Sequence, residues 1–155
     1  MKIPLTQNKF ALIDSCDYSW LMQWKWRYNG RYALRNLPRP HRKAIYMHRA
    51  ILERMGFQHF EHTDHINGDK LDNRRKNLRS ATNAQNQNNR GKPHNNTSGF
   101  KGVSLLQRSQ KWMAQIGVDR KLKYLGCFDS PEEAALVYNR AAREYHGKFA
   151  YLNEV

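Results

Sequence analysis

The sequence has little cysteine, few acidic residues and no long hydrophobic run. Its two cysteines, Cys16 and Cys127, stand far apart and form no C-x-x-C pair, which argues against a cysteine-based zinc site and favours a reducing compartment. No apolar run approaches the roughly 20 residues that span a bilayer, and residues 1–6 lack the apolar core of a secretory signal. These absences predict a soluble, cytoplasmic protein that is not secreted and has no membrane partner.

The shortage of acidic residues leaves a large positive charge. The 155 residues include 27 Lys and Arg but only 13 Asp and Glu, so the formal net charge is +14. Residues 1–97 hold 18 basic against 7 acidic residues, whereas residues 98–155 hold 9 against 6. A chain this basic attracts polyanions, and nucleic acid is the usual one.

The most unusual motif occupies residues 64–86, within the more basic part. It begins Asp64-His65, passes through Asn77 and ends Gln85-Asn86, with basic residues crowded between them. Carboxylate and amide oxygens suit a hard divalent cation such as Mg²⁺, and an imidazole can take a proton from water near neutral pH. The combination makes the chain a candidate nuclease.

Local patterns in residues 1–56 predict a small mixed region. We expect a turn at Asn29-Gly30, a basic exposed loop at 38–43, and a helix from His48 to Met55 that Gly56 ends. Short strands are expected at 10–13, 31–35 and 44–47.

Residues 57–92 predict a strand, loop, strand and helix in that order. The strands are expected at 63–66 and 77–81, with a turn forced at 67–69, and Thr82 is placed to cap a short helix. Residues 91–99 are rich in turn formers and poor in apolar side chains, which predicts a linker centred on 93–97.

Residues 98–155 predict a three-stranded antiparallel sheet packed on one helix. Residues 111–118 alternate between apolar and other side chains, and Ser130-Pro131 begins a helix that Gly147 ends. The flanking strands are expected at 100–105 and 121–125, the second ended by Gly126. The fold class is therefore α+β.

The run D-H-I-N-G-D-K-L-D-N-R-R-K-N-L-R, followed by A-T-N-A-Q-N, resembles the HNH (ββα-metal) endonucleases, particularly the phage and intron-encoded homing type. The resemblance implies that His65 is the general base and that Asn77 fastens the loop and helps to fix the His65 ring. It also implies that Asp64 and Asn86 bind one divalent ion. Asn86 replaces the final histidine of the eponymous pattern, which favours Mg²⁺ or Mn²⁺ over zinc.

Alternatives remain for several of these residues. An Asp-His pair can be an ordinary surface pair, and Asn83, Asn88 or Asn89 could take the place of Asn86. We expect His48 and His62 to be structural rather than ligands. A basic group is predicted near the phosphates, although it could be only a solvated face: Arg74, Arg75, Lys76 and Arg79.

Residues 98–155 resemble a second family, the plant Apetala-two/ethylene-response-factor DNA-binding domain, through F-K-G-V, K-W-M-A-Q-I, Y-L-G-C-F-D and E-E-A-A. The resemblance implies that the sheet lies in the major groove, although a solvated face is the alternative. Ser104, Gly117 and Leu122 stand where the plant domains usually carry arginine, so base preference does not transfer. The candidates for DNA contact are Lys101, Gly102, Ser104, Gln115 and Tyr124.

The sequence thus predicts an HNH endonuclease domain at 1–92, divided into 1–56 and the ββα-metal motif at 57–92, then a linker and a DNA-binding domain at 98–155. We expect a metal-dependent endonuclease of homing or phage type acting on double-stranded DNA, in the host cytoplasm if it is phage-encoded. One active-site motif per chain favours a monomer that nicks one strand. The alternatives are a non-catalytic DNA-binding regulator and a less specific phage DNA-processing nuclease.

Overall fold

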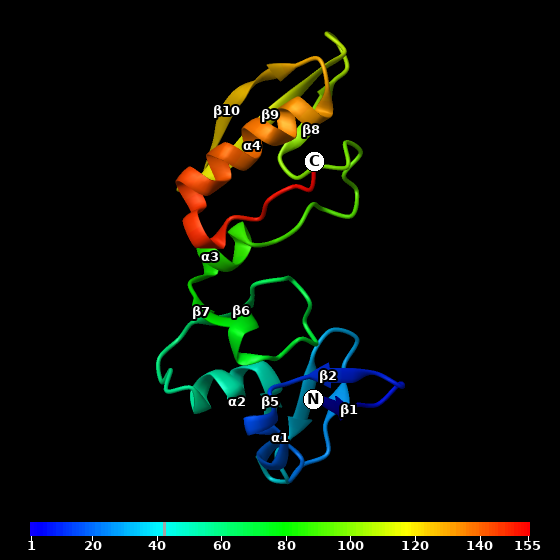
Figure 1. Cartoon of the computed structure of the whole chain (residues 1–155), viewed down its shortest axis with the longest axis vertical. Coiled ribbons are helices and arrows are strands. Elements are labelled where there is room, and N and C mark those ends of the chain that lie inside the picture. The colour runs from blue at the N-terminus through cyan, green and yellow to red at the C-terminus, as the bar shows by residue number, and fades with distance from the viewer. Residues whose placement is uncertain (42) are drawn as a thin grey trace. The chain divides into compact units, whose positions relative to one another are not determined.

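The computed structural model describes residues 1–41 and 43–155, so Arg42 of the predicted basic loop lies outside the described residues. The chain forms two compact units, Met1–Asn86 and Gln87–Val155, which are described separately (Figure 1). Both combine short antiparallel strands with helices, which confirms the α+β class. Among the described residues, no helix has the length and apolar character that a bilayer span requires.

The first unit is built from three small antiparallel sheets and their helices. A hairpin of β1 (Lys2–Pro4) and β2 (Phe10–Leu12) leads into α1 (Ser15–Leu21), and a sheet follows in the order β3-β4-β5. Its strands are β3 (Arg27–Tyr28), β4 (Ala33–Asn36) and β5 (Ala44–Tyr46). Helix α2 (Met47–Arg54) leads to a second hairpin, β6 (His62–His65) and β7 (Leu78–Ala81), with the short 3-10 turn η1 (Arg75–Asn77) before β7. Helix α3 (Asn83–Asn88) follows.

The core of this unit joins segments that are distant in sequence. Ile3, Leu21, Ile51 and Leu78 are all buried in one cluster. The sequence patterns identified β2, β4, β5, α2 and the second hairpin to within a few residues, but missed β1, α1 and β3. Helix α1 was missed because its buried positions are Asp17 and Leu21, so it lacks the apolar stripe that marks a surface helix.

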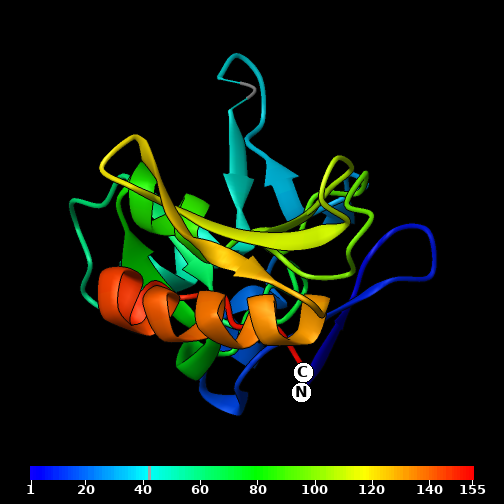
Figure 2. The same ribbon diagram turned by 90° about the horizontal axis from the view of Figure 1, so that it is seen from above.

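The second unit is the predicted sheet and helix. Strands β8 (Val103–Leu106), β9 (Lys111–Val118) and β10 (Lys121–Phe128) pair in the order β10-β9-β8. Helix α4 (Pro131–His146) covers one face (Figure 2), and the short turn η2 (Gly147–Phe149) follows it. Ala114 and Ile116 of β9 are buried in the two core clusters that also hold helix residues of α4. Ser130 caps the helix as predicted, since its Oγ accepts from the Glu133 amide at 3.1 Å.

Two boundaries differ from expectation. Gly126 does not end β10; it adopts a φ of +133° at a register shift, a bulge that lets the strand continue to Phe128. The two units divide at residues 86 and 87, inside α3, rather than at the expected linker. Residues 87–97 belong to the second unit because the Lys101 ammonium donates to the Asn88 and Arg90 carbonyls, at 2.7 and 2.6 Å.

The close packing at Gly102 yields a stability prediction. A Cβ at Gly102 would overlap the Tyr138 ring, and the φ of Gly102 is +75°. Gly102→Ala is therefore expected to destabilise the second unit by about 3 kcal/mol or more, since overpacking adds to backbone strain. Gly99→Ala is the matched control, because Gly99 has a φ of +82° but open space around it. Urea unfolding followed by Trp112 fluorescence would measure both, and equal losses would contradict the packing argument.

Candidate active site

The second hairpin places the two leading candidates side by side at the end of β6. Asp64 pairs with Arg79 and His65 pairs with Leu78 across the antiparallel ladder. Both side chains are almost fully enclosed, with 1% and 0% of their surface exposed. Burial of two polar groups in succession is costly unless each is matched by a partner.

The loop between the strands is tied down by Asn77. Its amide nitrogen donates to Asn67 Oδ1 at 2.9 Å and to the Asp72 carbonyl at 2.7 Å, while its Oδ1 accepts from the Asn67 amide at 3.0 Å. Gly68, with a φ of +77°, makes the tight turn inside this loop. Asn77 therefore fastens the loop from within.

The same loop is fixed to the N-terminal hairpin. The Leu12 amide donates to the Leu71 carbonyl and the Asn73 amide donates to the Leu12 carbonyl, both at 2.8 Å. This short parallel bridge pins β2 against residues 71–73. The first 56 residues thus hold the loop of the candidate site in place.

Asn73, which no sequence pattern singled out, holds the His65 ring. His65 Nε2 lies 3.2 Å from Asn73 Oδ1. The Asn73 amide nitrogen donates to the Leu71 carbonyl at 3.3 Å and approaches Met47 Sδ at 3.7 Å, so its oxygen must face the ring. His65 Nε2 therefore carries the hydrogen, and the proton-accepting nitrogen is Nδ1. Asn73 thus contacts the ring directly, whereas Asn77 bonds to the loop residues Asn67 and Asp72.

A second histidine packs directly on the first. The His48 ring stands edge-on to His65 with centroids 5.2 Å apart, and Tyr32 lies 4.9 Å from His48. Burial lowers the pKa of His65 to about 4, although the Asn73 hydrogen bond opposes the shift. Burial lowers the pKa of His48 to about 3, with nearby His65, Arg49 and Lys70 adding to the effect. Both rings are neutral at pH 7, and the structural role expected for His48 includes a contact with the candidate base.

The Asp64 carboxylate is balanced by an arginine. Arg79 Nε and Nη2 lie 2.8 and 2.7 Å from Asp64 Oδ2. A buried carboxylate without such a cation would be strongly disfavoured. Arg79, predicted to lie near phosphates, is thus engaged with the predicted metal ligand.

Two more of the predicted phosphate-binding arginines are engaged with buried aspartates. Arg74 forms a two-pronged ion pair with Asp72, which lowers the pKa of that carboxyl group. Arg75 does the same with Asp17 of α1, at 2.8 and 2.7 Å. Lys76, by contrast, is exposed. The basic run is therefore largely a set of structural cations rather than a solvated face.

Comparison with known proteins identifies this arrangement. A profile of the HNH endonuclease family matches residues 41–88. Protein 3.8 of Escherichia phage T7 is 37% identical over 87 residues, which cover 56% of this chain and 71% of that protein. The chain belongs to the HNH endonuclease family. The match begins before the ββα motif and so takes in β5, α2 and His48.

The C-terminal region of this HNH protein is similar to plant transcription factors. The AP2-like ethylene-responsive factor TOE2 of Arabidopsis thaliana is 36% identical over 63 residues, 41% of this chain and 13% of that protein. Dehydration-responsive element-binding protein 2D of the same plant is 42% identical over 67 residues, 41% of this chain and 32% of that protein. No solved structure matches the chain.

The donor set of the HNH region fits a hard divalent ion. Asp64 offers a buried carboxylate that already attracts a cation, and Asn86, half-buried on α3, offers an amide oxygen. Thr82 and Gln85 form a reciprocal capping box, at 3.2 and 2.9 Å, that begins the helix carrying Asn86. No group of three or more His, Cys, Asp or Glu that could hold a metal ion occurs in the part of the chain that is described.

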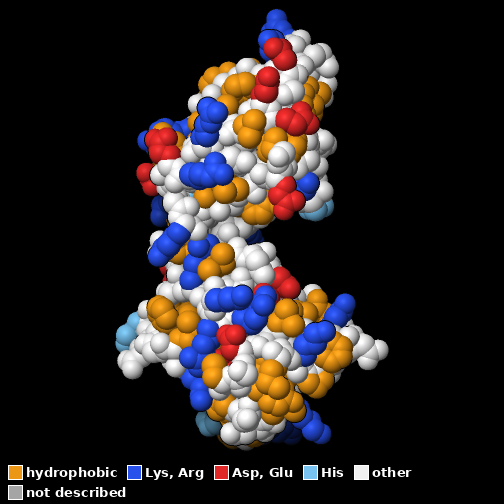
Figure 3. All heavy atoms as spheres, viewed as in Figure 1, with side chains coloured by type: hydrophobic (Ala, Val, Ile, Leu, Met, Phe, Trp, Pro, Cys, Tyr) orange, Lys and Arg blue, Asp and Glu red, His pale blue; other side chains and the backbone are white. Residues whose placement is uncertain are grey.

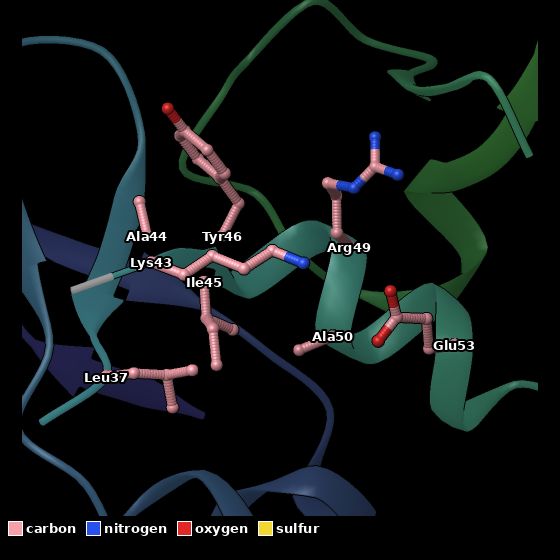
Figure 4. A pocket seen from close by; sticks show the side chains of 8 residues that line it. All are labelled: Leu37, Lys43, Ala44, Ile45, Tyr46, Arg49, Ala50 and Glu53. Carbon is pink, nitrogen blue, oxygen red and sulfur yellow. The ribbon is translucent and has the colours of Figure 1, made fainter. Parts of the chain in front are cut away.

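A basic hollow lies elsewhere in the HNH region. A depression of about 520 Å³ between β5 and α2 is lined by Lys43, Arg49 and Glu53 over an apolar floor (Figure 4). Arg49 also stacks on Phe60, with its guanidinium 4.7 Å from the ring centre. Tyr46 lines this hollow, and the centre of its ring lies 5.5 Å from the centre of the His48 ring. Neither Asp64 nor His65 belongs to the lining.

The candidates in the second unit fall into two groups. Ser104, Gln115 and Tyr124 lie on its sheet, and Tyr124 is exposed. Lys101 is half-buried, where burial lowers its pKa to about 8, and Gly102 lies under Tyr138. The three sheet residues are therefore available to a ligand of the sheet. Lys101 and Gly102 instead take part in the packing of the unit.

The buried histidines predict an acid-sensitive HNH unit. In the unfolded chain both histidines have a pKa near 6.5. Below that pH the two histidines therefore bind protons in the unfolded state but not in the folded state. The free energy of unfolding, measured in EDTA, is therefore expected to fall from pH 7 to pH 5, by up to about 1.4 kcal/mol per pH unit for each histidine.

The control for this prediction is His48→Phe, which keeps a ring and removes one titrating group. Trp112→Phe in the background leaves Trp20, Trp24 and Trp26 to report on the first unit by fluorescence during urea unfolding. The variant should lose about half of the pH slope. A slope unchanged by His48→Phe would contradict the assignment.

The ion pairs predict different roles for adjacent basic residues. Arg75→Met removes two charge-assisted hydrogen bonds from buried Asp17 and is expected to cost about 1.5–3 kcal/mol of stability. Lys76→Met is expected to leave stability within about 0.5 kcal/mol but to weaken DNA binding and lower its salt slope by about one. Urea unfolding and binding at several salt concentrations would separate the two, and the reverse pattern would refute both roles.

Proposed function

We propose that this member of the family is a metal-dependent endonuclease of homing or phage type that hydrolyses phosphodiester bonds in double-stranded DNA. The observation that supports it most is the pairing of a buried carboxylate and an oriented neutral imidazole on β6. A decayed regulator has no need to keep two costly buried groups in register. The net charge of +14 favours a polyanionic substrate, and basic side chains are visible on both units in Figure 3.

In this proposal His65 is the general base. Asn73 holds hydrogen on Nε2, so Nδ1 accepts the proton of the attacking water. The ring is neutral at pH 7, as a base must be, and a pKa near 4 makes it weakly basic in the absence of substrate. The negative charge of a bound phosphate favours the protonated ring and so strengthens the base when DNA is present.

The remaining residues bind the metal ion or the DNA, or keep other side chains in place. Asp64 and Asn86 would bind one Mg²⁺ or Mn²⁺, which supplies charge neutralisation at phosphorus when bound. Asn77 keeps the loop closed, and Arg79 keeps the Asp64 carboxylate oriented. Lys76 contacts the DNA backbone. The second unit adds affinity and register through Ser104, Gln115 and Tyr124.

One such site per chain favours a monomer that nicks one strand.

The less specific phage DNA-processing nuclease is the second candidate, supported by the similarity to Protein 3.8 of phage T7. A defined cleavage site in the suspected home-locus duplex would distinguish the homing type, and scattered nicks would favour the processing enzyme.

The decisive test is His65→Ala. Loss of a general base is expected to slow cleavage of supercoiled plasmid in Mg²⁺ by about 10²–10⁴-fold, while affinity for DNA stays unchanged because the side chain is buried. His62→Ala is the matched control, since His62 lies on the same strand with a solvent-accessible side chain. EDTA should stop the wild-type reaction. Full cleavage by His65→Ala would refute the base, and no cleavage by wild type with any metal would favour the regulator.

A further inference from the structure

The open face of the second unit exposes large apolar side chains. On β9, Ala114 and Ile116 point into the core, so Gln115 between them points away from α4. Its ladder partner Tyr124 is 65% exposed, and Leu122, two residues earlier on β10, is 72% exposed. Such exposure of two neighbouring large side chains indicates a surface with a ligand.

The residue between them shows which face they occupy. The Lys123 ammonium contacts the Tyr145 hydroxyl of α4 at 2.9 Å, so Lys123 lies on the helix side and Leu122 and Tyr124 lie on the other. Leu122 pairs with Gly117, which has no side chain, so the leucine stands over bare backbone and can be approached closely. Most of the open face carries uncharged residues: Ser104, Leu106, Met113, Gln115, Gly117, Leu122, Tyr124 and Cys127. Lys111 shares the face at the end of β9, where its ammonium is paired with Asp129 at 3.0 Å.

The charge of the unit identifies the class of ligand. Residues 103–128, which form the sheet and its turns, hold five basic residues and one acidic residue, whereas residues 129–155 hold three basic and five acidic ones. The sheet half is therefore positive and the helix half negative. Exposed cations flank the strand ends: Arg108, Lys111, Arg120 and Lys121. A face with an uncharged centre and a positive rim fits a polyanion in which charged groups flank a less polar surface.

The family resemblance implies that this sheet docks in the major groove of double-stranded DNA. We propose that its open face prefers A·T pairs there, with Leu122 and Met113 on thymine methyl groups and Gln115 on adenine. Guanine is read mainly by Arg or Lys, which the centre of the face lacks, since Lys111 lies at its end and is paired with Asp129. Glutamine suits adenine, and apolar side chains suit the thymine methyl group. The rim cations bind phosphates. Double-stranded RNA is disfavoured because its major groove is narrow and uracil has no methyl group.

The inference rests on the proposed function only for its partner, DNA, and its test does not depend on cleavage. The full chain carrying His65→Ala, in EDTA, would first select a preferred duplex from a random pool. Each thymidine of that duplex would then be replaced by deoxyuridine, which removes the methyl group alone. We expect one or two of these changes to weaken binding by about three- to tenfold.

The variant Leu122→Ser should bind the thymidine and deoxyuridine duplexes equally at one of those positions. Leu136→Ser is the control, because Leu136 is an exposed leucine of α4 and should leave the difference intact. Selection of a G·C-rich site, or equal affinity of the parent chain for both duplexes, would overturn the proposal. So would a dimer that Leu122→Ser dissociates without changing DNA affinity. Inactivity of the wild-type enzyme would overturn only the proposed function.

Discussion

A buried carboxylate needs a cation beside it, and this requirement organises the HNH unit. Asp64 is balanced by Arg79, Asp72 by Arg74 and Asp17 by Arg75. All three arginines come from residues 74–79, so one short segment supplies counter-charges to β6, to the loop and to α1, where Arg54 adds a second cation 3.3 Å from Asp17. Most of the positive charge in residues 74–79 therefore balances buried carboxylates of the HNH unit.

Burial in the HNH unit also sets the protonation and the orientation of His65, the candidate base. Asn73 sets the proton on one side of His65, while the His48 and Tyr32 rings fill the space beside it. Enclosure keeps the imidazole neutral and fixed, which suits a group that must receive a proton. In the proposed mechanism, burial also keeps the ring weakly basic until an anion binds, which would couple proton transfer to the binding of DNA.

Sequence reasoning went furthest where structure is locally determined. The cap at Thr82, the cap at Ser130 and the alternation along β9 are short-range patterns, and each was found. Asn73 and the Arg75–Asp17 pair were not, because their partners lie 8 and 58 residues away and no spacing rule links them. The buried charge of Asp17 also concealed α1. The roles of Asn77 and Asn86 came from family resemblance, which local physics alone could not have supplied.

The contacts of Lys101 bear on how modular this chain is. Its ammonium holds the carbonyl groups of Asn88 and Arg90, which are the last helical residue of α3 and a residue just beyond it. The helix that carries Asn86 therefore ends on bonds made from a residue past the apparent linker. Cutting the chain at that linker would leave those carbonyls to water. An exchange of the C-terminal region at residues 93–97 would therefore separate Lys101 from the carbonyl groups that it holds.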